Sequence, residues 1–100
     1  MKAIFLDAAV SELNDTFEYY ELQQTNLGSR FVSAIEKSVE LIEHYPKGWH
    51  SLSQDIRRCL VKNFPYGIIY QIKGNDIFII AIANLHRKPN YWNDRLNKAK

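Results

Sequence analysis

The chain has 100 residues, 46% of them hydrophobic, and a formal net charge of +2, which is enough for a single domain over residues 1–100 and too little for two. It has no basic-then-apolar leader and no apolar run near the ~20 residues that span a bilayer, so we expect a cytoplasmic protein without a membrane contact. The single cysteine, Cys59, excludes an internal disulfide and should be a buried core residue.

The first expected elements are a short strand and a helix. Lys2–Leu6 contains three large apolar side chains and stops at Asp7, so it predicts a strand, with Asp7 as the N-cap of the helix that follows. From Ala8 to about Gln24, apolar side chains recur at steps of three and four residues, and most acidic ones fall elsewhere. This spacing is typical of an amphipathic helix.

A second helix should follow a short break. Asn26–Ser29 interrupts the first pattern, and helical spacing resumes at Phe31. The second helix should end near Tyr45, because Pro46 disfavours helical backbone in the residue before it. Two helices joined by so short a link should pack as an antiparallel hairpin.

The second half of the chain is rich in strand signals. Pro46–Ser51 has the composition of a loop, and three strand-like runs follow, namely Ile56–Lys62, Tyr66–Ile72 and Ile77–Ala83. Short turns between consecutive strands favour an antiparallel meander. The last run is apolar at every position, which suits a strand shielded on both faces. We therefore predict an α+β fold in the order β-α-α-β-β-β, with a single layer of helices on a small sheet.

Positive charge is concentrated in the predicted strands and beyond them. Residues 1–50 carry four Lys and Arg against eight Asp and Glu, a net −4, whereas residues 51–100 carry nine against three, a net +6. Acidic solvated helix faces explain the negative half. The positive half indicates a basic face for a polyanion or for an acidic partner.

The segment from Asn84 onward combines cations with aromatic rings, and Pro89 should keep a regular element from running through it. Nucleic acid binding needs cations for phosphates and flat rings for unstacked bases. Candidate residues for binding a nucleic acid or another target are Arg57, Arg58, Lys62, Lys88, Trp92 and Arg95. RNA cleavage would also need proton transfer and a cation at the phosphate, for which the candidates are His86, Arg87 and Tyr91.

Structural roles are an alternative for each of these residues. Tyr91 and Trp92 could fold back over the sheet, which is the better explanation for Trp92, and the arginines could be solvated charges on an edge strand. His44 and His50 have no cysteine or carboxylate cluster beside them, and the chain has no glycine-rich phosphate loop. We therefore expect neither a metal nor a cofactor.

Several segments together resemble one protein family. These are Arg57-Arg58-Cys59-Leu60, the run Phe64–Tyr70, the apolar strand Ile77–Ala83 and the tail His86–Trp92. They resemble the RelE/ParE superfamily, the toxins of type II toxin–antitoxin modules of the plasmid-stabilisation type. The resemblance covers almost the whole chain. It implies a growth-inhibiting toxin that a cognate antitoxin neutralises, and we expect an acidic-hydrophobic antitoxin segment to bind along the helices and the sheet.

The resemblance implies two alternative targets. RelE-like members cleave mRNA on the ribosome, and ParE-like members inhibit DNA gyrase. The chain resembles the RelE type at Arg58, Arg87 and Tyr91, but it has Gly67 where RelE carries a catalytically important arginine. This difference favours the gyrase-directed function. An mRNA endonuclease, or a non-toxic remnant that only binds an antitoxin, is the alternative. We also expect that replacing Arg87 or Tyr91 would leave the fold stable, because both lie beyond the last core strand.

Overall fold

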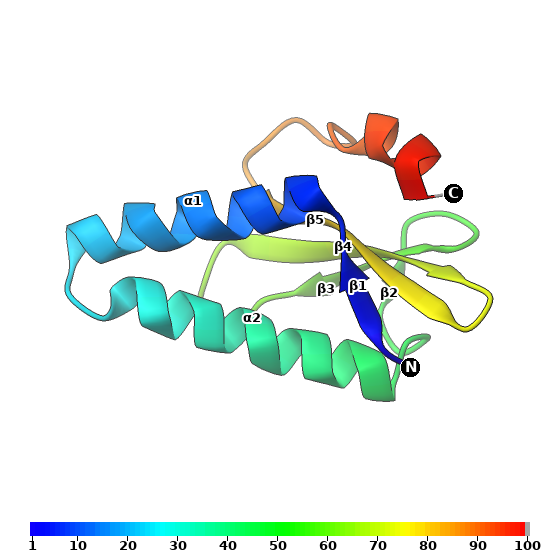
Figure 1. Cartoon of the computed structure of the whole chain (residues 1–100), viewed down its shortest axis with the longest axis horizontal. Helices are drawn as coiled ribbons and strands as arrows, with labels where there is room; N and C mark the ends of the chain where they lie inside the picture. The colour runs from blue at the N-terminus through cyan, green and yellow to red at the C-terminus, as the bar shows by residue number, and fades with distance from the viewer. Residues whose placement is uncertain (100) are drawn as a thin grey trace.

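The computed structural model describes residues 1–99 and consists of one five-stranded sheet with two helices against one face (Figure 1). The elements in chain order are β1 (Ala3–Phe5), α1 (Asp7–Gln23), α2 (Leu27–His44), β2 (His50–Ser51), β3 (Ile56–Leu60), β4 (Tyr66–Lys73), β5 (Asp76–Asn84) and the 3-10 helix η1 (Asn93–Ala99). Among the described residues, no helix is both long and apolar enough to cross a membrane.

The sheet has the strand order β1-β5-β4-β3-β2. The meander β3-β4-β5 is antiparallel, which confirms the prediction from the short turns. β1 pairs with β5 in parallel, with Phe5 opposite Ile79, so the sheet is mixed. The α+β class is confirmed, and the six predicted elements occur in the predicted order as β1, α1, α2, β3, β4 and β5.

The prediction that residues 46–51 form a loop was wrong for the last two of them. His50 and Ser51 form β2 and pair with Arg58 and Arg57 of β3. The expected edge strand is therefore covered over part of its length. Two residues are too few to give an alternating pattern in the sequence, and their pairing depends on where β3 lies.

The N-cap of α1 also differs from the expectation. Leu6 occupies that position without a side-chain cap, and Asp7 is the first helical residue. Leu6 instead continues β1, since its backbone N–H donates to the carbonyl of Ile79 at 3.0 Å. An acidic side chain in the first turn still interacts favourably with the helix dipole.

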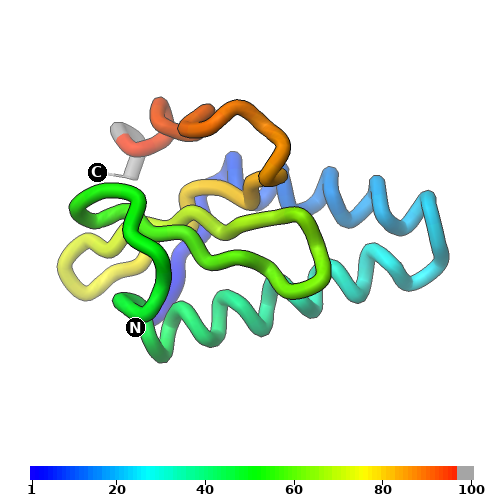
Figure 2. The backbone as a smooth tube through the Cα atoms, turned by 180° about the vertical axis from the view of Figure 1, so that it is seen from behind, coloured from blue at the N-terminus to red at the C-terminus, as the bar shows by residue number. Residues whose placement is uncertain are grey.

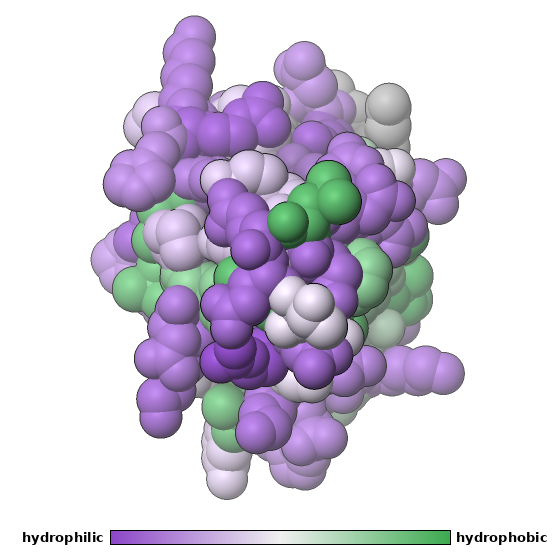
Figure 3. Space-filling model, turned by 90° about the vertical axis from the view of Figure 1, so that its left-hand side faces the viewer, coloured by the Kyte–Doolittle hydropathy of each residue, from purple (hydrophilic) through white to green (hydrophobic). Residues whose placement is uncertain are grey.

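The helices lie antiparallel, as predicted, and meet closely at their connection. Asn26, in the left-handed region with φ 71°, reverses the chain. The carboxylate of Glu21 then accepts from the backbone N–H groups of Asn26 at 2.9 Å and Gly28 at 3.0 Å. These bonds satisfy helix-start donors that otherwise have no partner. The end of the molecule that carries this connection is mostly hydrophilic (Figure 3).

The core has a layer on each face of the sheet. Between the helices and the sheet, Phe31 and Ile35 of α2 pack on Ile68 and Tyr70 of β4. On the opposite face, which we call the outer face, a smaller cluster contains Ile56, Ile69, Ile80, Ala81, Ala83 and Trp92. After β5 the chain turns back alongside the sheet (Figure 2), so β5 is shielded on both faces, as its composition predicted.

Candidate functional site

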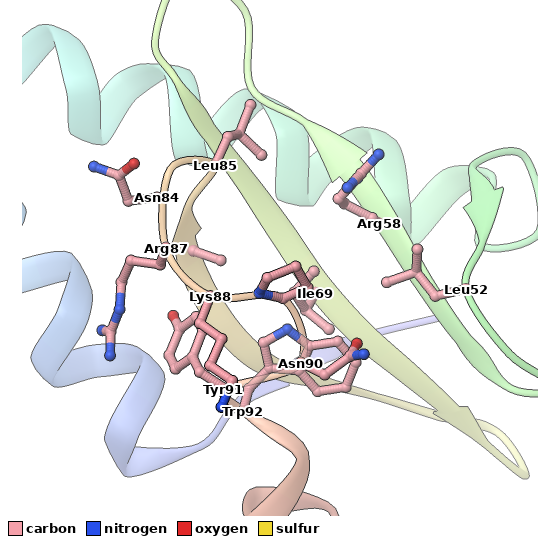
Figure 4. Close-up of a pocket in the computed structure, with 12 residues that line it drawn as sticks. Leu52, Arg58, Ile69, Asn84, Leu85, Arg87, Lys88, Asn90, Tyr91 and Trp92 are labelled. Atoms are coloured by element: carbon pink, nitrogen blue, oxygen red, sulfur yellow. The ribbon is translucent and has the colours of Figure 1, made fainter.

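A small pocket opens on the outer face, between β3, the end of β5 and the segment of residues 85–96, which we call the tail. Its volume is about 170 Å³. It is lined by Leu52, Arg58, Ile69, Ala83, Asn84, Leu85, Arg87, Lys88, Pro89, Asn90, Tyr91 and Trp92. Arg58 and Arg87 lie on opposite sides of it, with the guanidinium of Arg87 directed away from Arg58 (Figure 4). We call it the outer pocket.

The outer pocket is cationic. Arg58, Arg87 and Lys88 line it, and no Asp or Glu is among the described residues around it. The Nε atom of Arg58 is buried and has no hydrogen-bond partner within the described part of the chain. A buried donor without a partner costs about 1–3 kcal/mol. The pocket is therefore positively charged, and one of the arginines that line it has a nitrogen without a partner.

Gly67 leaves room for the side chain of Arg58. A Cβ at Gly67 would come within 3.1 Å of Cγ and 3.2 Å of Cδ of Arg58, and within 3.4 Å of Leu85. The aliphatic part of Arg58 thus occupies the space into which a side chain at position 67 would project. A larger side chain at position 67 of β4 would compete with Arg58 for this space. The strands therefore contribute a single arginine, Arg58, to the pocket.

Glu12 of α1 holds the tail in place. Its carboxylate accepts from both terminal nitrogens of Arg95, at 2.8 and 3.1 Å, and from the hydroxyl of Tyr91 at 2.6 Å. It also accepts from the backbone N–H of Ile82 at 3.0 Å, and Arg95 donates to the carbonyl of Ile80 at 3.1 Å. These two bonds satisfy backbone groups on the edge of β5 beyond Ile79, which is the last residue that pairs with β1.

Both the hydroxyl and the ring of Tyr91 make contacts within the protein. Burial, followed by the hydrogen bond to Glu12, raises the pKa of Tyr91 well above its usual value. The guanidinium of Arg87 lies 3.9 Å from the ring centroid, a cation–π contact. The hydroxyl therefore stays protonated at neutral pH, and one face of the ring is covered.

The structure brings only some of the candidate residues together. Arg58, Arg87, Lys88 and Tyr91 line the outer pocket, and Trp92 forms its base as a core residue with 6% of its surface exposed. Burial of Trp92 agrees with the covering role that the sequence favoured for this ring. Tyr91 also packs against the outer cluster as a partly buried residue, which agrees with the alternative that it folds back over the sheet.

The other candidates lie elsewhere. Arg57 points to the helical face and donates to the carbonyls of Trp49 at 2.8 Å and Lys47 at 3.3 Å, because neighbouring residues of a strand face opposite sides. Arg95 is paired with Glu12. His86 is exposed, donates through its backbone to Asn84 at 2.8 Å, and is not among the residues that line the pocket.

A second concavity lies on the helical side, and Lys62 belongs to it. It is a groove of about 700 Å³ between α2 and the β3–β4 turn. It is lined by Leu27, Arg30, Ser33, Ala34, Lys37, Ser38, Leu41, Lys62, Asn63 and Phe64. We call it the α2 groove. Three cations and no acidic residue occur among these described lining residues.

Sequence reasoning missed Glu12 and Leu52. Glu12 occurs among several acidic residues of one helix, and nothing in its spacing separates it from solvated ones such as Glu18. Its role depends on the tail, whose Arg95 is 83 residues away. Leu52 follows β2, which was not predicted. The cations of the tail gave no indication in the sequence of which one would pair with Glu12.

Comparisons with known proteins agree with this architecture. The profile of the family described as "ParE toxin of type II toxin-antitoxin system, parDE" matches residues 3–91. A solved structure described as "Chromosomal ParDE TA system from P. aeruginosa" has a similar fold, with a TM-score of 0.61 at 18% identity, over 84% of this chain and 95% of that chain. No curated protein sequence matches the chain. The chain therefore belongs to the ParE family of toxins of type II toxin–antitoxin systems.

Proposed function

We propose that this toxin arrests growth by inhibiting DNA gyrase in the cytoplasm and does not cleave mRNA. The observation that carries the proposal is the bonding of Tyr91. RNA cleavage through the 2′-hydroxyl needs a free proton acceptor and a free proton donor beside the phosphate. The hydroxyl of Tyr91 donates to Glu12 at 2.6 Å, and its raised pKa keeps it protonated, so it cannot accept a proton at neutral pH.

The remaining nuclease candidates support the same conclusion. His86 is outside the set of residues that line the outer pocket, and Gly67 supplies no cation. Arg95 is neutralised by Glu12 at 2.8 Å. An arrangement with cations but without a free acid and base can bind a target and is poorly suited to proton transfer.

The alternative function is a RelE-like mRNA endonuclease. It is favoured by one observation, the presence of both Arg58 and Arg87 at the outer pocket, where they could stabilise charge on a phosphate. A non-toxic antitoxin-binding remnant is a third alternative, which the absence of growth arrest would identify.

Three measurements separate these functions. We expect that expression of the toxin alone arrests growth, and that the purified toxin inhibits supercoiling by gyrase. Primer extension on a reporter message should give no cuts in codon register before arrest. Early cuts that disappear in His86→Ala would contradict the proposal and would assign proton transfer to His86.

A matched pair of variants tests whether the outer pocket carries toxicity. Arg87→Gln removes one charge from the pocket, and Lys2→Gln removes one from an exposed position at the other end of the chain. We expect the first to abolish growth arrest and the second to retain it. Equal toxicity of the two variants would place the functional surface elsewhere.

We further infer that the cognate antitoxin binds in the α2 groove. The groove combines three cations, Arg30, Lys37 and Lys62, with apolar side chains such as Leu41, which is 48% exposed. A segment that alternates acidic and apolar side chains is complementary to it in both respects. Such a segment would fold as it binds.

Charge reversal tests this placement. Lys37→Glu puts an acidic group into the groove, whereas Lys47→Glu makes the same change outside it. We expect the first to weaken the complex with the co-expressed antitoxin by about tenfold or more, and the second to have little effect. Unchanged affinity of Lys37→Glu, together with amide protection that avoids residues 62–64, would contradict the inference.

A further inference from the structure

The positive charge and the apolar surface of the outer pocket together favour one class of ligand. We propose that it binds the carboxylate of an aspartate or glutamate in a peptide segment of a protein partner. This segment is acidic and also carries apolar side chains that can pack on the leucines around the pocket. This goes beyond the proposed function, because it concerns the group that the pocket accepts and holds whether or not gyrase is the target.

The charges of the pocket favour an anionic ligand. Arg58, Arg87 and Lys88 line it without an acidic neighbour among its described lining residues. Within the described part of the chain, no group accepts from the buried Nε of Arg58. Hydrogen bonds from a guanidinium to a carboxylate are charge-assisted and roughly twice as strong as neutral ones.

The apolar part of the site favours a protein ligand. Three leucines with exposed surface lie around Arg58: Leu52 at 37%, Leu60 at 56% and Leu85 at 44% exposed. Leu52 and Leu85 line the pocket together with Ile69 and Pro89. These side chains can pack on the methylene groups of an acidic residue and on its apolar neighbours, and burial of their surface contributes about 25 cal/mol per Å². A phosphate with its ribose offers little apolar surface.

The aromatic residues of the site argue against single-stranded nucleic acid. Unstacked bases bind by lying on free ring faces, worth about 1–3 kcal/mol for each base. Trp92 is 6% exposed, and the ring of Tyr91 is covered by Arg87 at 3.9 Å and approached by Arg95 at 5.2 Å. Neither of the two rings that the sequence suggested for stacking therefore has a free face for a base: Trp92 is buried, and Tyr91 is covered by Arg87.

Side-chain NMR of the full-length, ¹⁵N-labelled toxin tests the proposal. The probes are the peptides acetyl-Leu-Glu-Leu-amide and acetyl-Leu-Gln-Leu-amide, and a short single-stranded thymidine oligonucleotide. We expect the Nε–H resonance of Arg58 to shift saturably with the glutamate peptide, with affinity at least about tenfold above that for the glutamine peptide. The resonance of Arg57, which is on the helical face, should stay in place.

A variant provides the matched control. Arg58→Lys keeps the charge and removes the planar guanidinium, so we expect at least about tenfold weaker binding of the glutamate peptide while the backbone spectrum stays that of the folded chain. Shifts with the oligonucleotide but not with the glutamate peptide would overturn the proposal in favour of nucleic acid. Equal shifts with both peptides, or none with any probe, would also overturn it. The readout is binding, so a failure to inhibit gyrase would leave it unaffected.

Discussion

Glu12 and Arg95, 83 residues apart in the chain, form a two-point ion pair with N···O distances of 2.8 and 3.1 Å. Both side chains are largely removed from water, with 16% of Glu12 and 19% of Arg95 exposed. Hydrogen bonds between Glu12 and Arg95 raise the pKa of Arg95 above its usual value. The pair fastens the tail to α1 and so fixes one wall of the outer pocket.

Removal of the charge of Glu12 should release the tail. We expect Glu12→Gln to lower the free energy of unfolding by about 1–3 kcal/mol, because Arg95 is left without its counter-charge and the bond to Tyr91 is weakened. Urea denaturation measures the loss, and hydrogen exchange should accelerate at Ile82 and at residues 91–96. Glu18→Gln, at an exposed position of the same helix, is the control and should change neither. Unaltered exchange in the tail of Glu12→Gln would refute this role.

Neighbouring arginines on β3 should respond in opposite ways. Arg57→Ala removes donors to the carbonyls of Trp49 and Lys47, so we expect unfolding to become easier by about 1–2 kcal/mol. Arg58→Ala removes a buried nitrogen that has no partner, so stability should stay within about 0.5 kcal/mol of the parent. Growth arrest should be lost only in Arg58→Ala once both proteins are shown to be folded. The reverse assignment of stability and toxicity would contradict the orientation of β3.

The contact between the helices should be sensitive to a single methyl group. A Cβ at Gly28 would lie 2.5 Å from the backbone oxygen of Phe17 and 2.9 Å from its ring, so the helices would have to separate. We expect Gly28→Ala to cost about 2 kcal/mol or more. At Gly48 the nearest atoms are 3.3 and 3.4 Å away, so Gly48→Ala should cost less than about 1 kcal/mol. Thermal denaturation of both variants makes the comparison, and similar melting temperatures would count against the close approach.

Alkaline pH should destabilise the fold through Cys59. Burial raises the pKa of its thiol from 9.0 to about 11, and the side chain is 1% exposed. The unfolded chain therefore ionises first, so this contribution to stability is complete below pH 9 and is lost as the pH rises towards 11. The loss amounts to at most about 1.4 kcal/mol for each pH unit in this window.

The variant Cys59→Ala isolates this effect. It should be somewhat less stable at pH 8, because a buried group is removed, but its stability should fall less steeply between pH 9 and 10. Burial also raises the pKa of Tyr70 to about 12, which adds a loss of the same sign above pH 10 in both proteins. Urea midpoints across this range measure the slopes, and identical slopes would show that the Cys59 thiol does not titrate as described.

The sequence by itself determined the elements whose signals are local. Apolar spacing predicted both helices, and strand-like runs separated by short turns predicted β3, β4 and β5, whose antiparallel pairing followed from the length of the turns. The motifs of the second half predicted the toxin family. These predictions succeeded because each depends on side chains within one element or one turn.

Only the tertiary structure decided which charged side chains act together. It separated Arg57 from Arg58 across the sheet, placed Lys62 in the α2 groove, and paired Arg95 with Glu12. The parallel pairing of β1 with β5 and the short β2 were decided in the same way. Each of these contacts joins different segments of the chain, and its energy depends on where both segments lie. A local sequence pattern gives the composition of a basic region, whereas the packed sheet fixes the face on which each cation stands.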